Sequence, residues 1–78
     1  MTVKMAHTLN YWWDKLYTCV REYQRDVTAG ELARFTGVSR NTAQKYLLHL
    51  KKHGVATERR IRHNRAMKKS VFCTKGEM

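Results

Sequence analysis

Residues 28–54, TAGELARFTGVSRNTAQKYLLHLKKHG, contain two short helical patterns separated by a tight turn. Thr28 precedes the first pattern and Glu31 follows three residues later, which is the spacing of a capping box, where each side chain bonds the other residue's backbone amide. Gly37 ends this helix, because glycine accepts the left-handed conformation that a sharp turn requires. The stretch therefore predicts two helices joined by this turn, over residues 29–35 and 40–53.

The stretch resembles the helix-turn-helix family in its turn and in the spacing of small and apolar residues around that turn. The residues that carry the resemblance are Ala33, Gly37, Val38, Ser39, Thr42, Ala43, Tyr46 and Leu47. A small side chain at Ala33 lets the two helices approach each other, and Val38 fills the wedge between them. Ala43 departs slightly from the family pattern, in which a larger aliphatic residue is commoner. An ordinary helical hairpin with a glycine turn is the alternative interpretation.

Two segments with strand-forming composition, residues 55–61 and 68–74, follow the second helix and flank a polar, basic loop. A hairpin directly after a helix-turn-helix is the wing of a winged helix-turn-helix domain, so the resemblance extends over about residues 27–75. It implies one domain over residues 1–78, mainly α with a small β-hairpin. The implied order is helix, short strand at 26–27, two helices, strand, wing and strand. The composition leaves the register of the hairpin open.

A first helix is expected over residues 8–24, after a flexible start at residues 1–7. Its predicted core-facing stripe, widened by Trp12 and Cys19, consists of Leu9, Trp13, Leu16, Val20 and Tyr23. This helix carries more aromatic surface than one small core needs. Two explanations of this surface remain open. The rings could belong to a thick core stripe with some of them exposed, or the helix could form a homodimer with a second copy of itself.

The net charge of +10 lies entirely in the second half of the sequence. Residues 1–33 contain four basic and four acidic side chains, whereas residues 34–78 contain twelve basic side chains against Glu58 and Glu77. A polyanion is the natural partner of such a segment. A solvated basic surface or an acidic membrane face is the alternative, but the adjoining helix-turn-helix pattern favours nucleic acid.

The resemblance implies which side chains contact DNA. The candidates for base contacts, at the start of the second helix of the motif, are Arg40, Asn41, Gln44 and Lys45. Arginine can bond guanine bidentately, and asparagine or glutamine can bond adenine in the same way. The candidates for contacts with the DNA backbone are Ser39, Thr42, Lys51, Lys52, Arg59, Arg60, Lys68 and Lys69. The wing tip is expected to carry Arg62, His63 and Arg65, which suit a narrow, electronegative minor groove.

No constellation in the sequence indicates an enzyme, a cofactor or a metal. The six acidic residues are scattered, and no glycine-rich phosphate loop is present. His49 and His53 share a helix face, but no third ligand accompanies them. Cys19 and Cys73 are expected to be small buried hydrophobes. No apolar run is long enough for a membrane span, so we expect a cytoplasmic, nucleoid-associated or otherwise intracellular protein.

Together these features predict a sequence-specific regulator of transcription that binds double-stranded DNA. Repression by occupying an operator is favoured over activation. Two other classes of function remain open. One is a winged-helix module for protein interaction, and the other is a module that binds nucleic acid, including RNA, without sequence preference. The aromatic side chains of the first helix keep the RNA interpretation open, because bases stack on such rings.

Overall fold

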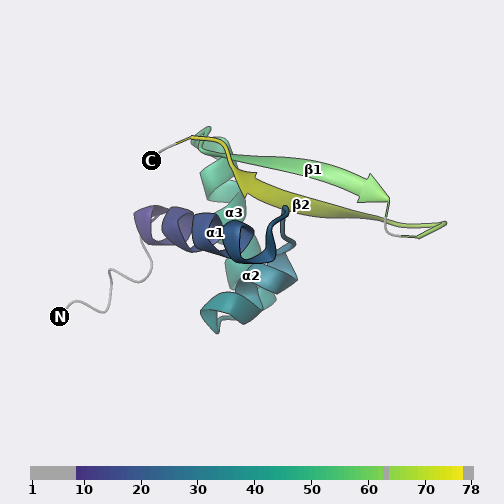
Figure 1. Ribbon diagram of the computed structural model, residues 1–78, viewed down its shortest axis with the longest axis horizontal. Coiled ribbons are helices and arrows are strands. Elements are labelled where there is room, and N and C mark those ends of the chain that lie inside the picture. The colour runs from purple at the N-terminus through teal and green to yellow at the C-terminus, as the bar shows by residue number, and fades with distance from the viewer. Residues whose placement is uncertain (1–8, 63, 77–78) are drawn as a thin grey trace.

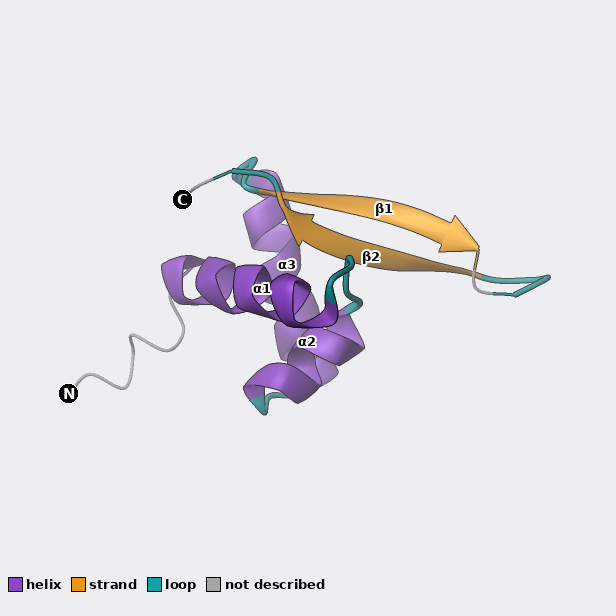
Figure 2. Cartoon of the chain, viewed as in Figure 1, coloured by secondary structure: helices purple, strands orange, loops and turns teal. Residues whose placement is uncertain are grey.

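The computed structural model describes residues 9–62 and 64–76, which form three helices and one antiparallel hairpin. The elements in chain order are α1 (Leu9–Tyr23), α2 (Ala29–Thr36), α3 (Arg40–Lys52), β1 (Ala56–Arg62) and β2 (Lys68–Thr74). The helices pack together on one side, and the hairpin lies against them with its outer half extending beyond them (Figures 1 and 2). This arrangement confirms the predicted winged helix-turn-helix fold. The expected flexible start at 1–7 lies outside the described residues.

The two helices of the motif begin and end where local chemistry predicts. The Glu31 amide donates to the Thr28 hydroxyl at 3.1 Å, and the Thr28 amide donates to the Glu31 carboxylate at 2.9 Å, so the predicted capping box is confirmed. Gly37 has a φ of 81°, and its amide donates to the Ala33 carbonyl at 2.8 Å, which closes α2. These contacts set the short turn before α3.

The centre of the core-facing stripe of α1 is rotated by about 50°, or half a residue, from the predicted one, towards Trp12 and Cys19, which were expected only to widen it. Trp12, Leu16 and Cys19 are its fully buried members, whereas Trp13 is only partly buried. The Trp12 ring stacks on Tyr46 of α3, with ring centroids 4.9 Å apart and planes 5° from parallel. Trp13, predicted to face the core, packs against it from the side and stays partly buried, because the stacking on Tyr46 places Trp12 at the centre.

The short strand expected at 26–27 is reduced to a single pair of residues. Val27 forms an isolated antiparallel bridge with Phe72 of β2, through backbone hydrogen bonds of 3.0 and 2.7 Å. The strand cannot continue, because Thr28 immediately becomes the N-cap of α2 and the chain turns into the helix. The bridge nevertheless joins the root of the hairpin to the entrance of the motif.

The register of the hairpin runs from Ala56 opposite Thr74 to Arg62 opposite Lys68. Residues directly opposite each other share a face of the sheet, and successive residues alternate between the two faces. Ala56 and Phe72 belong to the central hydrophobic cluster, so their face of the hairpin is the one directed at the helices. No helix in the described part of the chain is both long and apolar enough to cross a bilayer.

Replacing Glu31 with glutamine should reduce the loss of stability in acid. The Arg25 guanidinium bonds both oxygens of this carboxylate, at 3.0 and 2.6 Å. That hydrogen bonding, with a further bond from the Thr28 amide, lowers the pKa of Glu31 from 4.5 to about 2. Because the folded-state pKa is lowered, the ionised carboxylate contributes stability that is complete above pH 4.5 and is lost as the pH falls towards 2.

Urea unfolding between about pH 7 and pH 2.5 measures this effect. The wild-type protein should lose more stability over the acidic part of this range than Glu31→Gln loses. Glu22→Gln is the matched control, since Glu22 is an exposed glutamate on α1. An acid dependence that is the same in all three proteins would contradict the assignment.

Candidate nucleic-acid interface

The outward face of α3 is a ridge of polar and charged side chains. Ala43, Leu47 and Leu50 are buried and mark the inward face of the helix. At about 100° per residue, the opposite face is a line of four exposed side chains. This line, which we call the outer ridge of α3, consists of Asn41, Lys45, Leu48 and Lys52. Among the described residues, this ridge is the part of α3 that lies farthest from the core.

Arg40 and Gln44 lie beside the outer ridge, on the edge of α3 that faces the hairpin. They line one wall of an open hollow of about 500 Å³ between the helices and β2. The other residues around this hollow, from the start of α2 and from the tip and outer part of the hairpin, are Thr28, Ala29, Gly30, Met67, Lys68, Lys69 and Ser70. The starts of two helices, which favour anions, and three basic side chains therefore surround one space.

The hydroxyls of Ser39 and Thr42 form the N-cap of α3. The Thr42 amide donates to the Ser39 hydroxyl at 3.2 Å, and that hydroxyl donates to the Thr42 hydroxyl at 3.0 Å. Both were predicted to contact the DNA backbone. In this arrangement their first role is to begin the helix and to direct its N-terminus, together with Arg40 and Asn41, outwards.

The strand alternation divides the cations of the hairpin between its two faces. Arg60 and Ser70, and farther out Arg62 and Lys68, stand opposite each other and share the face of Ala56 and Phe72, which we call the helix-side face. Arg59 lies on the opposite face, and so does Lys69 by its register, although Lys69 is close enough to the outer end of β2 to line the hollow as well. The predicted backbone contacts in the hairpin therefore do not form one continuous surface.

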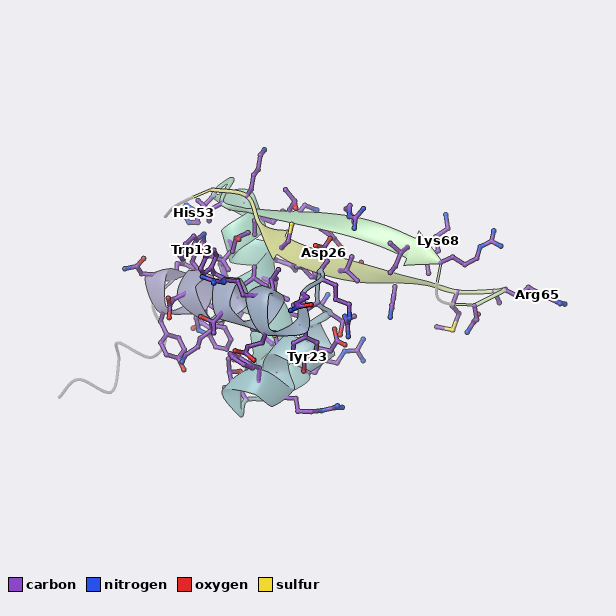
Figure 3. The ribbon with its side chains drawn as sticks, viewed as in Figure 1. Trp13, Tyr23, Asp26, His53, Arg65 and Lys68 are labelled. Carbon is purple, nitrogen blue, oxygen red and sulfur yellow. The ribbon has the colours of Figure 1, made fainter. Side chains whose placement is uncertain are left out.

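Two cations of the predicted set are paired with carboxylates at the root of the hairpin. Arg59 lies 2.9 Å from Asp26, and Lys51 lies 2.7 Å from Glu58. The hydrogen bond from Lys51 lowers the pKa of Glu58, which keeps this carboxylate charged. Figure 3 shows Asp26 between the helices and the hairpin. Because the cation of each pair is at least half exposed, each pair contributes little to stability, but both join β1 to the helical body.

Arg65 lies at the far end of the hairpin, away from the helices (Figure 3). The turn beside it is held by the Asn64 side chain, whose carbonyl accepts from the amides of Ala66 and Met67 at 2.9 and 3.0 Å. Arg62, predicted at the tip, instead ends β1 opposite Lys68. His63, the third predicted tip residue, lies outside the described residues.

His49, His53 and the two cysteines, which the structure describes, do not form a metal site or a reactive-thiol site. No three potential metal ligands come together within residues 9–62 and 64–76. Cys19 is fully buried, and its burial raises the pKa of the thiol to about 11, which disfavours the reactive thiolate. The Cys73 sulfur lies 3.1 Å from the Thr57 hydroxyl.

Comparison with known proteins agrees with this geometry. A protein-family model described as an HTH (helix-turn-helix) domain matches residues 13–61, which is more than half of the chain. This chain belongs to the HTH domain family. Among solved structures, the chain is similar to Stf76 from the Sulfolobus islandicus plasmid-virus pSSVx, with a TM-score of 0.59 and 25% sequence identity. That similarity covers 90% of this chain and 84% of the other chain. No curated protein matches the chain.

Family and fold together identify a DNA-binding domain of the winged HTH type. Sequence reasoning found the cations around its hollow but missed Ser70, Ala29 and Gly30, which are uncharged. It also did not identify that Arg59 and Arg60 lie on opposite faces of the hairpin. The alternation of a strand separates adjacent residues by itself, but which of the two faces the helices follows only from the pairing with β2 and the burial of Phe72.

Replacing Arg60 with alanine should weaken DNA binding and reduce its dependence on salt. Arg60 lies on the helix-side face, which adjoins the hollow, so we expect it to neutralise one phosphate. The loss of one phosphate contact lowers the slope of log affinity against log salt by about 0.9. The measurement is a salt titration of binding to duplex DNA by fluorescence anisotropy.

Arg59→Ala is the comparison variant, because Arg59 is adjacent in sequence but lies on the opposite face and is already paired with Asp26. Its slope should stay close to that of the wild-type protein. Equal decreases in slope for the two variants would show that the two faces of the hairpin contribute alike.

Proposed function

We propose that this protein is a sequence-specific regulator of transcription that binds double-stranded DNA and acts as a repressor. The observation that carries the proposal is the hollow between α3 and β2. Arg40 and Gln44, which can recognise bases, stand there across from basic side chains that can hold phosphates. A site for base recognition beside a site for backbone positioning is what a sequence-specific binder needs.

In the proposed complex, α3 enters the major groove with its N-terminal half against the bases. Arg40 would bond guanine, and Asn41 or Gln44 would bond adenine. Lys45 lies one turn beyond Asn41 on the outer ridge and would contact a base edge. The phosphates beside the groove would be held by Ser39, Thr42, Lys51 and Lys52, with Lys51 also bonded to Glu58.

The hairpin would lie along the DNA backbone, with its helix-side face towards the phosphates. Arg60, Arg62 and Lys68 would hold the backbone, and Arg65 at the far end would reach the minor groove. Repression is the proposed effect on transcription. Nearly all of the described helices and strands either form the core or carry the basic surface, and blocking an operator uses only these two.

Dimerisation through α1 stays a prediction. The contacts within one chain use much of the aromatic surface that suggested it, since Trp12 is buried and Trp13 stacks on Tyr17 at 5.2 Å. The Trp13 indole also donates to the Gly76 carbonyl at 2.6 Å. Tyr17, with 39% of its surface exposed, is the part of this face that a second chain could cover.

Selection of random duplex DNA on the purified protein, at near-physiological salt, tests the proposed function. A defined motif is the expected result, and an inverted repeat within it would indicate a dimer on matched half-sites. Salt-sensitive binding with no enriched motif would contradict sequence recognition. Stronger binding to competing single-stranded or duplex RNA would favour the RNA-binding alternative.

Arg40→Ala should lower affinity for the selected duplex by roughly 1–3 kcal/mol and weaken the base preference at one position. Lys52→Ala is the comparison, because a phosphate contact is lost alike on every sequence. Both variants are measured against the selected duplex and a scrambled duplex. If Arg40→Ala loses the same affinity on both duplexes, Arg40 is a backbone contact.

A further inference from the structure

Leu48 is the one apolar member of the outer ridge of α3. Its side chain is 45% exposed, although the neighbouring Leu47 and Leu50 are completely buried. Lys45 and Lys52 flank it three residues before and four residues after, so they lie on the same side of the helix. A single exposed leucine is ordinary on a protein surface, and the exposure alone carries no inference. Its position between two lysines on the ridge is the informative feature.

Among the described residues, Leu48 belongs neither to the core cluster nor to the partly buried side chains that pack against it. The core contacts of α3 come from the opposite face, through Ala43, Leu47 and Leu50. The hairpin lies on the edge of α3 that carries Arg40 and Gln44, about 40–80° around the helix from Leu48. In the described structure Leu48 is therefore presented to whatever approaches the outer ridge.

We infer that Leu48 contacts the methyl group of a thymine and gives the protein a preference for T·A at that position. The inference rests on the proposed function, in which the outer ridge enters the major groove. On the major-groove edges of the four base pairs, the thymine C5-methyl is the apolar group, and apolar side chains are its usual partners. The contact would bury the exposed part of Leu48 and the methyl together, which is favourable for both.

The thymine should be distinct from the bases that the start of α3 contacts. Leu48 is four residues beyond Gln44 and eight beyond Arg40, or about 6 and 12 Å along the helix axis. These separations exceed the spacing of adjacent base pairs, which is about 3.4 Å. The T·A preference is therefore expected at a position of its own within the motif, between the base that Lys45 contacts and the phosphates that Lys52 can approach.

Replacing thymine by uracil provides the sharpest test, since it removes the methyl and keeps the base pairing. Each thymine of the selected duplex is replaced in turn, and Kd is measured for the wild-type protein and for Leu48→Ala. We expect one position at which uracil weakens wild-type binding about three- to five-fold, the size expected for losing one buried methyl group. Leu48→Ala should bind the thymine duplex more weakly and should no longer distinguish thymine from uracil at that position.

Phe35→Ala is the control variant, because Phe35 has a similar exposure of 38% but lies on α2, outside the outer ridge. It should retain the wild-type response to uracil. The inference is overturned if no thymine of the motif responds to uracil, or if Leu48→Ala keeps the full response. It is overturned separately from the proposed function, which fails only if selection returns no motif at all. The uracil series on the wild-type protein does not depend on any variant.

Discussion

The pairing of Val27 with Phe72 is the constraint that relates the hairpin to the helices. Two backbone hydrogen bonds hold the root of β2 against the residue that precedes the cap of α2, and the Phe72 side chain enters the core. Because side chains alternate along a strand, fixing Phe72 inwards fixes the face of every other hairpin residue. A register shift of one residue would turn Arg59 towards α3 and Arg60 away from it. The composition of the basic surface thus depends on one buried aromatic residue.

The outer half of the hairpin carries a charge pattern that folding alone does not favour. Arg62 stands directly opposite Lys68, and like charges in this position destabilise a sheet. The carboxylates Asp26 and Glu58 pair with cations at the root, and residues 59–76 include no acidic side chain. The outer cations are left to repel one another until an anion neutralises them. Such a pattern is expected where stability has been exchanged for binding to a polyanion.

The parts of the fold that the sequence predicts are those set by neighbouring residues. The capping box of α2, the Gly37 turn and the extent of β2 depend on contacts over a few positions, and residue chemistry is sufficient to find them. The burial of Trp12 in preference to Trp13 depends on Tyr46, more than thirty residues away. Which hairpin residues face the helices depends on the strand register, which the composition of the hairpin leaves open. In the candidate site, sequence patterns therefore find the charged residues but not the geometry that groups them.

The neutral first half of the chain orients the basic second half. The Trp12 ring lies flat against Tyr46, and its buried indole nitrogen has no hydrogen-bond partner among the described residues. Such an unpaired group is unfavourable, by about 1–3 kcal/mol, so the packing of the two rings must offset it. This packing restrains the rotation of α3 about its axis. The rotation of α3 determines that Asn41, Lys45 and Lys52 point outwards. The aromatic side of α1 thereby controls the surface that we propose for DNA contact, although it is not part of that surface.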